Sequence, residues 1–326
     1  MVKIVNLFVV FILFWFVFIG CSNSGDAPLF GEPSTDNTFD GAKEETNAKG
    51  FVYETLGEWP QTKKEESVSV DTKCEQKTVG DFTYYKGSDS AWYLGIEEKK
   101  ADDNKPDDEI SYKWFKVEPI KWRVLSAEYD HDKNNSSPGV KFLLAENVII
   151  GQRYDNDNNN YENSEIRNWL NDVFLKTAFT TEEHNIIVTT IVDNSARTAN
   201  PDENEKQWNS GLNPYASDIP CNDKVFLLSE QEVTKKDYGF DIYNKYVGCG
   251  DGTSTSSRIH YATDYAKQLG VNQNSIFGPG SWWWLRSPCY SDVRNARIVG
   301  SNGCVPDNIL VSCGVGGVVP ALCVTK

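Results

Sequence analysis

The side chains that most often carry catalysis are few and scattered in this chain. Its three histidines, His131, His184 and His260, stand far apart, and no G-x-S-x-G, P-loop or H-E-x-x-H motif is present. A lone histidine is more often a surface or core residue than a general base, because proton transfer needs a partner at hydrogen-bond distance. The sequence therefore predicts a protein that is not an enzyme.

One polar stretch resembles the start of a calcium-binding loop. Residues 155–159 read DNDNN, as an EF-hand loop can begin, but the sixth position is Asn160 rather than Gly and the twelfth is Ile166 rather than Glu. The cysteines form no C-x-x-C pair with the spacing of zinc ligands. We therefore expect no metal and no other cofactor.

The N-terminal segment has the features of a secretory signal peptide. Residues 4–19 are apolar except for Asn6, and they follow the single charge of Lys3. This run is shorter than the roughly 20 apolar residues that span a bilayer as a helix. It predicts a cleaved signal peptide over residues 1–20 rather than a permanent anchor.

The end of this segment resembles the lipobox of bacterial lipoproteins. Gly20 lies directly before Cys21 at the close of the apolar run. Lipid on Cys21 would hold the exported protein on the membrane, since each buried methylene of an acyl chain contributes about 0.8 kcal/mol. We expect display on the outer surface of the cell, with an ordinary signal peptide or a short membrane anchor as the alternatives.

Composition divides the remaining chain into a tether and one folded domain. Residues 21–50 are rich in Gly, Ser, Asn, Asp and Pro and predict a flexible tether. Aromatic residues make up 13% of the chain, with ten Trp, so residues 51–326 can build a substantial core. The net charge of -15 argues against nucleic acid as a partner, because phosphate binding needs clustered Lys and Arg.

Short strands and helices are both expected in this domain. Strand patterns occur at 122–125, 141–145 and 224–228, and the Gly- and Val-rich chain after Ser281 predicts several more. Helices are expected after the capping residues Ser164 and Thr180, after the capping box of Ser229 with Glu232, and over 258–269. We therefore expect an α+β fold with helices flanking short antiparallel strands.

Six motifs occur in the order seen in a known bacterial family: LGEWPQ at 56–61, PIKWRVL at 119–125, ENSEIRNWLN at 162–171, KVFLLS at 224–229, WWLRSP at 283–288 and GVVPAL at 317–322. Together they resemble the domain family whose C-terminal part takes a C-type-lectin fold of the formylglycine-generating-enzyme type. Within that family the chain is most similar to the retroelement-diversified treponemal variable lipoproteins. The resemblance covers residues 51–326, although Val319 stands where the family commonly has Arg.

The resemblance implies that part of the chain is diversified by randomising adenines in Asn codons. An Asn codon randomised at its first two bases cannot encode Lys, Glu, Gln, Met or Trp. None of these five types occurs in residues 289–319. A Gly- and Val-rich strand region could also exclude several of them. Cys304 and Cys313 are then expected to be products of diversification rather than disulfide partners.

The same segment predicts a ligand-binding patch on a rigid framework. Small and apolar residues are spaced to face inward, above the tryptophans at 282–284: Ala296, Val299, Gly303, Val305 and Val311. Between them lie aromatic, charged and amide side chains of the mixture that binding patches use. The predicted ligand-binding residues are Tyr290, Ser291, Asp292, Val293, Arg294, Asn295, Arg297, Ser301, Cys304, Asp307, Asn308 and Ser312.

We expect non-catalytic recognition of an extracellular protein or glycan. Calcium-dependent sugar binding is not expected, because the chain has no Glu-Pro-Asn motif. An invariant structural or adhesive lipoprotein is the main alternative. An enzyme of the formylglycine-generating type would need an active cysteine pair, for which Cys313 and Cys323 are the late candidates.

The lipoprotein interpretation predicts the behaviour of Cys21→Ala. Without the thiol there is no site for the lipid, so the variant should be soluble or uncleaved and should leave the detergent phase on partitioning. Unchanged partitioning together with unchanged electrophoretic mobility would show that lipid on Cys21 does not hold the protein on the membrane.

Overall fold

The computed structural model describes residues 45–47, 50–98, 111–132, 139–195, 198, 220–241, 256–273, 278–289, 292–305 and 307–326. The signal segment, the predicted lipidation site Cys21 and most of the tether lie outside the described residues. No helix in the described part of the chain is long and apolar enough to cross a membrane.

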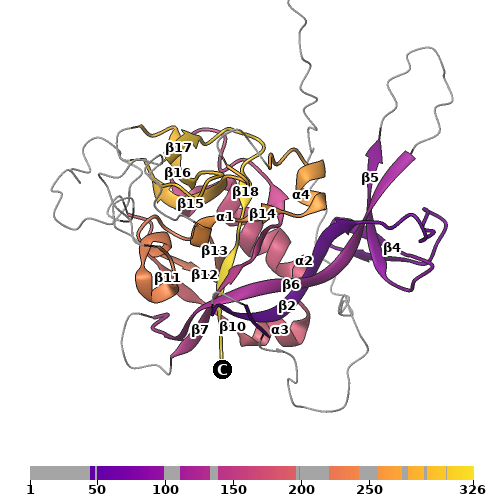
Figure 1. The fold of residues 1–326 in the computed structure, drawn as a ribbon, viewed down its shortest axis with the longest axis horizontal. Helices are drawn as coiled ribbons and strands as arrows, with labels where there is room; N and C mark the ends of the chain where they lie inside the picture. Colours follow the sequence, from indigo (N-terminus) through magenta and orange to yellow (C-terminus); the bar gives the residue numbers. More distant parts are fainter. Residues whose placement is uncertain are drawn as a thin grey trace, which may run out of the picture.

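A ten-stranded sheet runs through the whole described structure (Figure 1). Its two longest strands, β2 (Val52–Lys63) and β6 (Ser111–Tyr129), pair antiparallel and extend from the body of the molecule into a projecting arm. In the arm, β6 continues to β5 (Trp92–Glu98), β4 (Phe82–Lys86) and β3 (Gln76–Val79).

In the body, the same sheet continues from β6 to strands of the C-terminal half. The neighbours are β7 (Val140–Ala145), then β19 (Ala321–Val324), then β10 (Ile187–Val188). Two short strands complete it: β13 (Val225–Phe226) pairs with β19, and β1 (Glu45–Thr46) pairs with β2. The last strand of the chain therefore lies between strands that precede it by many residues.

A second sheet of five strands carries the predicted variable segment. Its order is β17 (Asp307–Leu310), β16 (Asn295–Val299), β15 (Trp283–Pro288), β18 (Gly317–Val318) and β9 (Ile150–Gly151). Two strand pairs stand apart: β11 (Thr190–Val192) with β12 (Cys221–Asp223), and β14 (Tyr261–Ala262) with β8 (Asn147–Val148). The expectation of several short strands after Ser281 is confirmed.

Helices are short, and their starts follow the predicted caps. Helix α1 (Glu165–Trp169) begins where the Ser164 hydroxyl accepts from the Arg167 N–H, and it runs through the π-turn η2 (Leu170–Phe174) into α2 (Leu175–Ala178). Helix α3 (Thr181–Ile186) has the capping box of Thr180 with Glu183. The remaining helical segments are α4 (Asp264–Gln268) and the single 3₁₀ turns η1 (Tyr161–Asn163), η4 (Glu232–Thr234), η5 (Lys236–Tyr238) and η6 (Ser256–Arg258).

The expected α+β fold with flanking helices, of the C-type-lectin type, is wrong. The structure is 43% strand and 18% helix, with one helix of 14 residues, and is mostly β. The helix expected over 258–269 begins only after Thr263, because Tyr261–Ala262 pairs as a parallel strand with β8. The capping box of Ser229 with Glu232 is present, but it starts one 3₁₀ turn rather than a helix.

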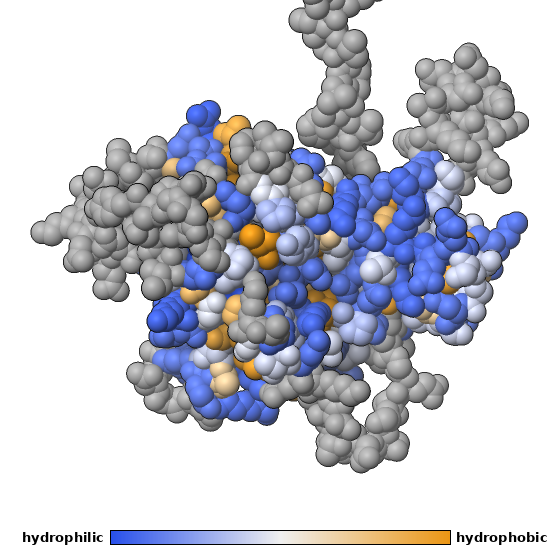
Figure 2. All heavy atoms as spheres, in the orientation of Figure 1, coloured by the Kyte–Doolittle hydropathy of each residue, from blue (hydrophilic) through white to orange (hydrophobic). Residues whose placement is uncertain are grey.

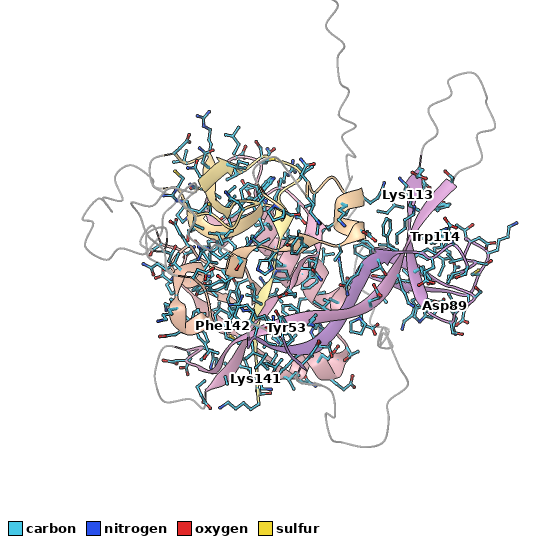
Figure 3. All side chains as sticks on the ribbon, viewed as in Figure 1. Tyr53, Asp89, Lys113, Trp114, Lys141 and Phe142 are labelled. Carbon is cyan, nitrogen blue, oxygen red and sulfur yellow. The ribbon has the colours of Figure 1, made fainter. Side chains whose placement is uncertain are left out.

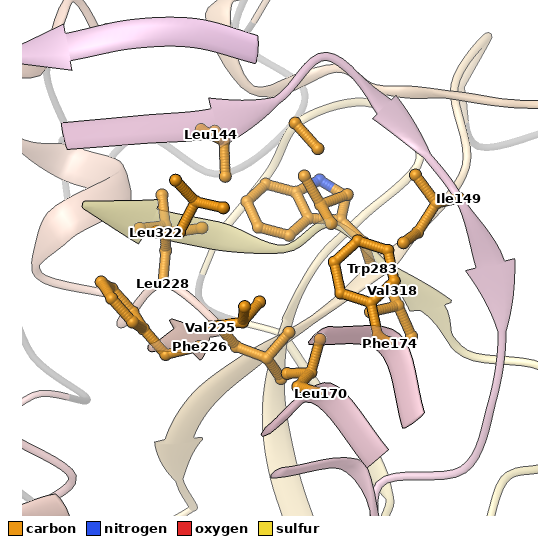
Figure 4. Close-up of a cluster of buried hydrophobic side chains, with 14 of the residues drawn as sticks. Leu144, Ile149, Leu170, Phe174, Val225, Phe226, Leu228, Trp283, Val318 and Leu322 are labelled. Carbon is orange, nitrogen blue, oxygen red and sulfur yellow. The ribbon is translucent and has the colours of Figure 1, made fainter. Parts of the chain in front are cut away.

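Large buried aromatics fill the space around the sheets, and Figure 4 shows part of this cluster around Trp283, Phe174 and Leu322. Two tryptophans are fully buried yet hydrogen-bonded: the Trp122 Nε1–H donates to the Leu56 carbonyl at 2.7 Å and that of Trp284 to Gln152 at 2.9 Å. Trp282 packs against the core from a half-buried position. The tryptophans at 282–284 are thus core residues, as predicted.

The position of β19 predicts that truncation after Pro288 unfolds the domain. The truncated chain loses the strand that hydrogen-bonds β7, β10 and β13, so their backbone groups and the apolar surface beneath them would be exposed. Thermal melts should show no cooperative transition. A chain ending at Thr325 keeps β19 and serves as the control. A cooperative melt of the truncated chain at the control's temperature would contradict the prediction.

Candidate recognition surface

The predicted patch lies where β15 turns back into β16 and along β17 at the edge of the five-stranded sheet. Tyr290 and Ser291 lie outside the described residues, and of Asp307 only the backbone is described. Arg294, Asn308 and Ser312 are exposed, whereas Asp292, Val293 and Asn295 are half-buried. The structure therefore brings part of the predicted set together on one surface, which we call the edge surface.

Two exposed apolar residues at the edge surface were not predicted from the sequence. Leu310, at the end of β17, is 52% exposed, and Val315 in the turn that follows is 36% exposed. They are two of only three large apolar side chains that are exposed in the described chain. The face of the molecule seen in Figure 2 is mostly hydrophilic, with small scattered apolar spots. A leucine at the end of an apolar strand carries no sequence signal that tells exposure from burial.

The turn into β16 is held by one buried amide. Asn159 is 1% exposed, and its Nδ2 lies 3.1 Å from the carbonyl oxygens of Cys289 and Asp292 and 2.7 Å from that of Asn295. Its backbone N–H donates to the Val293 carbonyl at 2.8 Å. The hydrogen bonds from Asn159 therefore hold the backbone of the turn whose side chains form part of the edge surface.

The loop that supplies Asn159 is the stretch that resembles a calcium site. The Asp155 carboxylate accepts from the backbone N–H of Asp157 at 2.9 Å and of Asn158 at 3.1 Å. Its second oxygen accepts from the Glu165 N–H at 3.3 Å, at the start of α1. These bonds define an Asx turn, and within the described residues no group of His, Cys, Asp or Glu has the arrangement of a metal site. The aspartate is explained by the turn that it shapes.

Three predicted ligand-binding residues are instead buried. Arg297 is 9% exposed because its side chain passes beneath β16, where its Nε lies 3.2 Å from the Glu230 carboxylate. Ser301 is 7% exposed, since the segment before β15 packs over it and the Gly280 N–H donates to its carbonyl at 3.0 Å. Cys304 is 5% exposed and disulfide-bonded, so the expectation that it is unpaired is wrong.

The predicted framework is confirmed. Ala296 and Val299 are fully buried in β16, Val311 is 2% exposed, and Gly303 and Val305 are buried between β16 and β17. Burial does not alternate along β16: residues 296–299 are all buried, so both faces of the strand are covered, and Arg297 is buried with them. The sequence near Arg297 does not indicate that this residue is buried, because its partner Glu230 lies far away in the sequence.

Burial acts strongly on that carboxylate. Glu230 is 1% exposed, and burial raises its pKa to about 7, while the nearby Arg297 guanidinium acts in the opposite direction. Glu232, two residues on, has a lowered pKa because Arg286 bonds it directly. Arg297 and Glu230 therefore form a framework pair under the edge surface rather than part of it.

The cysteine pair required by the enzymatic alternative has no support from this geometry. Cys323 is fully buried in β19, and burial raises the pKa of its thiol to about 12, far above the range in which a thiolate nucleophile forms. Cys313 is half-buried in the turn after β17. Neither is in a disulfide, nor are Cys74 and Cys221.

The contrast between Arg294 and Arg297 predicts opposite effects of the same substitution. Arg294→Ala should change the free energy of unfolding by no more than about 0.5 kcal/mol, because the side chain is exposed. Arg297→Ala should cost about 3–5 kcal/mol, because Glu230 stays buried without its cation. Without Arg297 the pKa of Glu230 rises further. The folded variant then holds a proton that the unfolded chain has released above its ordinary pKa of 4.5, so stability falls as the pH rises from there through the raised pKa, which lies above the parent's value of about 7.

Denaturant melts of the two variants, below and above that pH, check this. Combining Arg297→Met with Glu230→Leu is the matched control, since it removes both charges and should recover most of the loss. Equal stability of the two alanine variants at both pH values would show that Arg297 is not a framework residue.

Comparison with known proteins places the C-terminal part of this structure in a family. A family model described as a domain of unknown function, DUF6273, matches residues 138–326, which begin just before β7 and include the edge surface. No curated protein and no solved structure gives a match. Strands β1 to β6, including the arm, precede the matched segment. Because the match covers more than half of the chain, the chain belongs to the DUF6273 family.

Proposed function

We propose that this protein is a lipid-anchored, exported binding protein that recognises an extracellular protein or glycan through the edge surface, without catalysis. The observation that carries the proposal is the contrast between exposed and buried side chains within residues 292–312. Arg294, just before β16, and Asn308 and Leu310 on β17 are exposed, whereas Ala296 and Val299 of β16 are fully buried. Side chains set on such a fixed backbone lose little conformational entropy on binding.

The chemistry of the edge surface suits recognition. It combines a guanidinium, an amide, a hydroxyl and an exposed leucine, and the Arg294 Nε lies 3.5 Å from the Asp292 carboxylate. An apolar anchor with polar neighbours is the composition in which a few residues dominate affinity.

Two further observations support the wider proposal. The disulfide at Cys304 suits an oxidising, extracytoplasmic compartment, as the signal segment and Cys21 predict. Residues 289–319 contain no residue type that a randomised Asn codon fails to encode, which supports diversification of the exposed positions. The buried Arg297, Ser301 and Cys304 then belong to the fixed part of this segment.

A binding screen with a matched set of variants tests the proposal. The chain lacking residues 1–20, with Cys21→Ser, is applied to a glycan array and to a displayed peptide library. Leu310→Ala combined with Arg294→Ala should weaken binding of any selected ligand at least tenfold, about 1.4 kcal/mol, because such residues act as hot spots. Lys176→Ala, an exposed change on α2, is the control. Ligands that bind the double variant and the control equally would show that recognition lies elsewhere.

A further inference from the structure

A cavity of about 320 Å³ lies in the body of the molecule, beside the paired start of β2 and the part of β6 that borders β7. Tyr53 of β2 and Arg123 of β6 line it from one side, and Figure 3 labels Tyr53 near the crossing of these strands with β7. Glu146, between β7 and β8, and His260 and Tyr261 line it from the other. The wall thus combines residues before the family-matched segment with residues inside it.

His260 presents an unused acceptor in this wall. Its ring is 2% exposed, and Nδ1 lies 2.8 Å from the backbone carbonyl of Glu146. Since a carbonyl only accepts, Nδ1 carries the proton and Nε2 is left with a free lone pair. Nε2 is buried and has no hydrogen-bond partner. Burial lowers the pKa of His260 to about 4, so the ring is neutral at physiological pH.

Arg123 presents an unused donor in the same wall. Its guanidinium lies between the rings of Phe51 and Phe240, at 3.7 and 4.6 Å from their centroids. Nη1 donates to the Ser257 carbonyl at 2.9 Å and Nη2 to that of Tyr238 at 2.8 Å. The Nε–H is buried without a partner, on a side chain that is 2% exposed. A buried donor and a buried acceptor left unpaired beside one cavity are uncommon in folded proteins and call for a partner.

The remaining groups define what that partner must be. The Tyr53 hydroxyl accepts from the Asn47 amide at 3.0 Å and donates to the Glu146 carboxylate at 3.2 Å, which fixes this wall. Arg123 and Glu146 carry opposite charges, so a ligand ion of either sign is attracted by one and repelled by the other. Tyr261 is 47% exposed and offers an aromatic face beside the cavity. A volume near 300 Å³ is the low end for ligand sites and suits a single small ring.

We propose that this cavity binds the pyranose ring of a neutral sugar, with one hydroxyl donating to His260 Nε2, a second accepting from Arg123 Nε, and the ring packed on Tyr261. Vicinal hydroxyls supply a donor and an acceptor on adjacent carbons, which matches the two unpaired atoms. The uncharged ring suits the balanced pair of Arg123 and Glu146. A free monosaccharide and the terminal residue of a glycan share this chemistry. The site is separate from the edge surface, so either can fail without the other.

Saturation-transfer NMR and titration with glucose, galactose and N-acetylglucosamine test the site on the chain that lacks residues 1–20 and carries Cys21→Ser. His260→Phe keeps an aromatic ring against Trp283, its neighbour at 5.0 Å, but removes the acceptor, and should weaken binding at least tenfold. Tyr261→Ala changes an exposed residue, so the fold should be kept while binding weakens about fivefold. Arg294→Ala on the edge surface should have no effect.

Glycine and a sulfated monosaccharide serve as charged comparison ligands. Tighter binding of either than of the neutral hexoses would overturn the proposal, because the balanced charges would then not set the selectivity. Binding of no hexose would also overturn the proposal and would assign the unpaired atoms to water. Equal hexose affinity of Tyr261→Ala and the parent chain would overturn it as well. Glycans ending in the selected hexose, compared with the free sugar, distinguish the two sources. If His260→Phe fails to fold, Tyr261→Ala decides the outcome.

Discussion

The buried ion pair of Arg286 with Glu232 is the interaction on which the two sheets of this protein depend. Arg286 comes from β15 of the smaller sheet, and its guanidinium meets both oxygens of Glu232, at 2.5 and 2.9 Å. It also donates to the carbonyls of Leu227 and Asp193, each at 2.7 Å, just after β13 and β11. Mutual stabilisation raises the pKa of Arg286 and lowers that of Glu232. Removing one partner of such a pair costs about 3–5 kcal/mol, because the other charge stays buried.

This arrangement makes the backbone of the edge surface rigid. The strand that carries Arg286 pairs with β16, and below β16 the framework pair of Arg297 with Glu230 repeats the same device two residues before Glu232. Asn159 then fixes the turn from the other side. Three buried polar contacts thus hold the backbone from which exposed side chains project. A surface built in this way can change its exposed residues at little cost in stability.

Local signals allowed several parts of this structure to be predicted from the sequence. The caps at Ser164 and Thr180 depend on neighbours within a few residues. The failures all depend on distant partners. The helical period over 258–269 is overruled by the pairing of Tyr261–Ala262 with Asn147–Val148. The full lengths of β2 and β6 come from pairing with each other across a long separation, and nothing near Arg297 or His260 in the sequence indicates Glu230 or the cavity wall.

The place of β19 in the large sheet has a consequence for the order in which the chain folds. Residues 321–324 hydrogen-bond strands at 141–144, 187–188 and 225–226, so the centre of the sheet consists of contacts between segments far apart in sequence. Such contacts form slowly, because a large loop must close before they stabilise anything. A chain that emerges from its N-terminus cannot complete this sheet until its last residues are free. If the chain is exported, as proposed, this delay would keep the polypeptide open during passage through the membrane until its last residues have crossed.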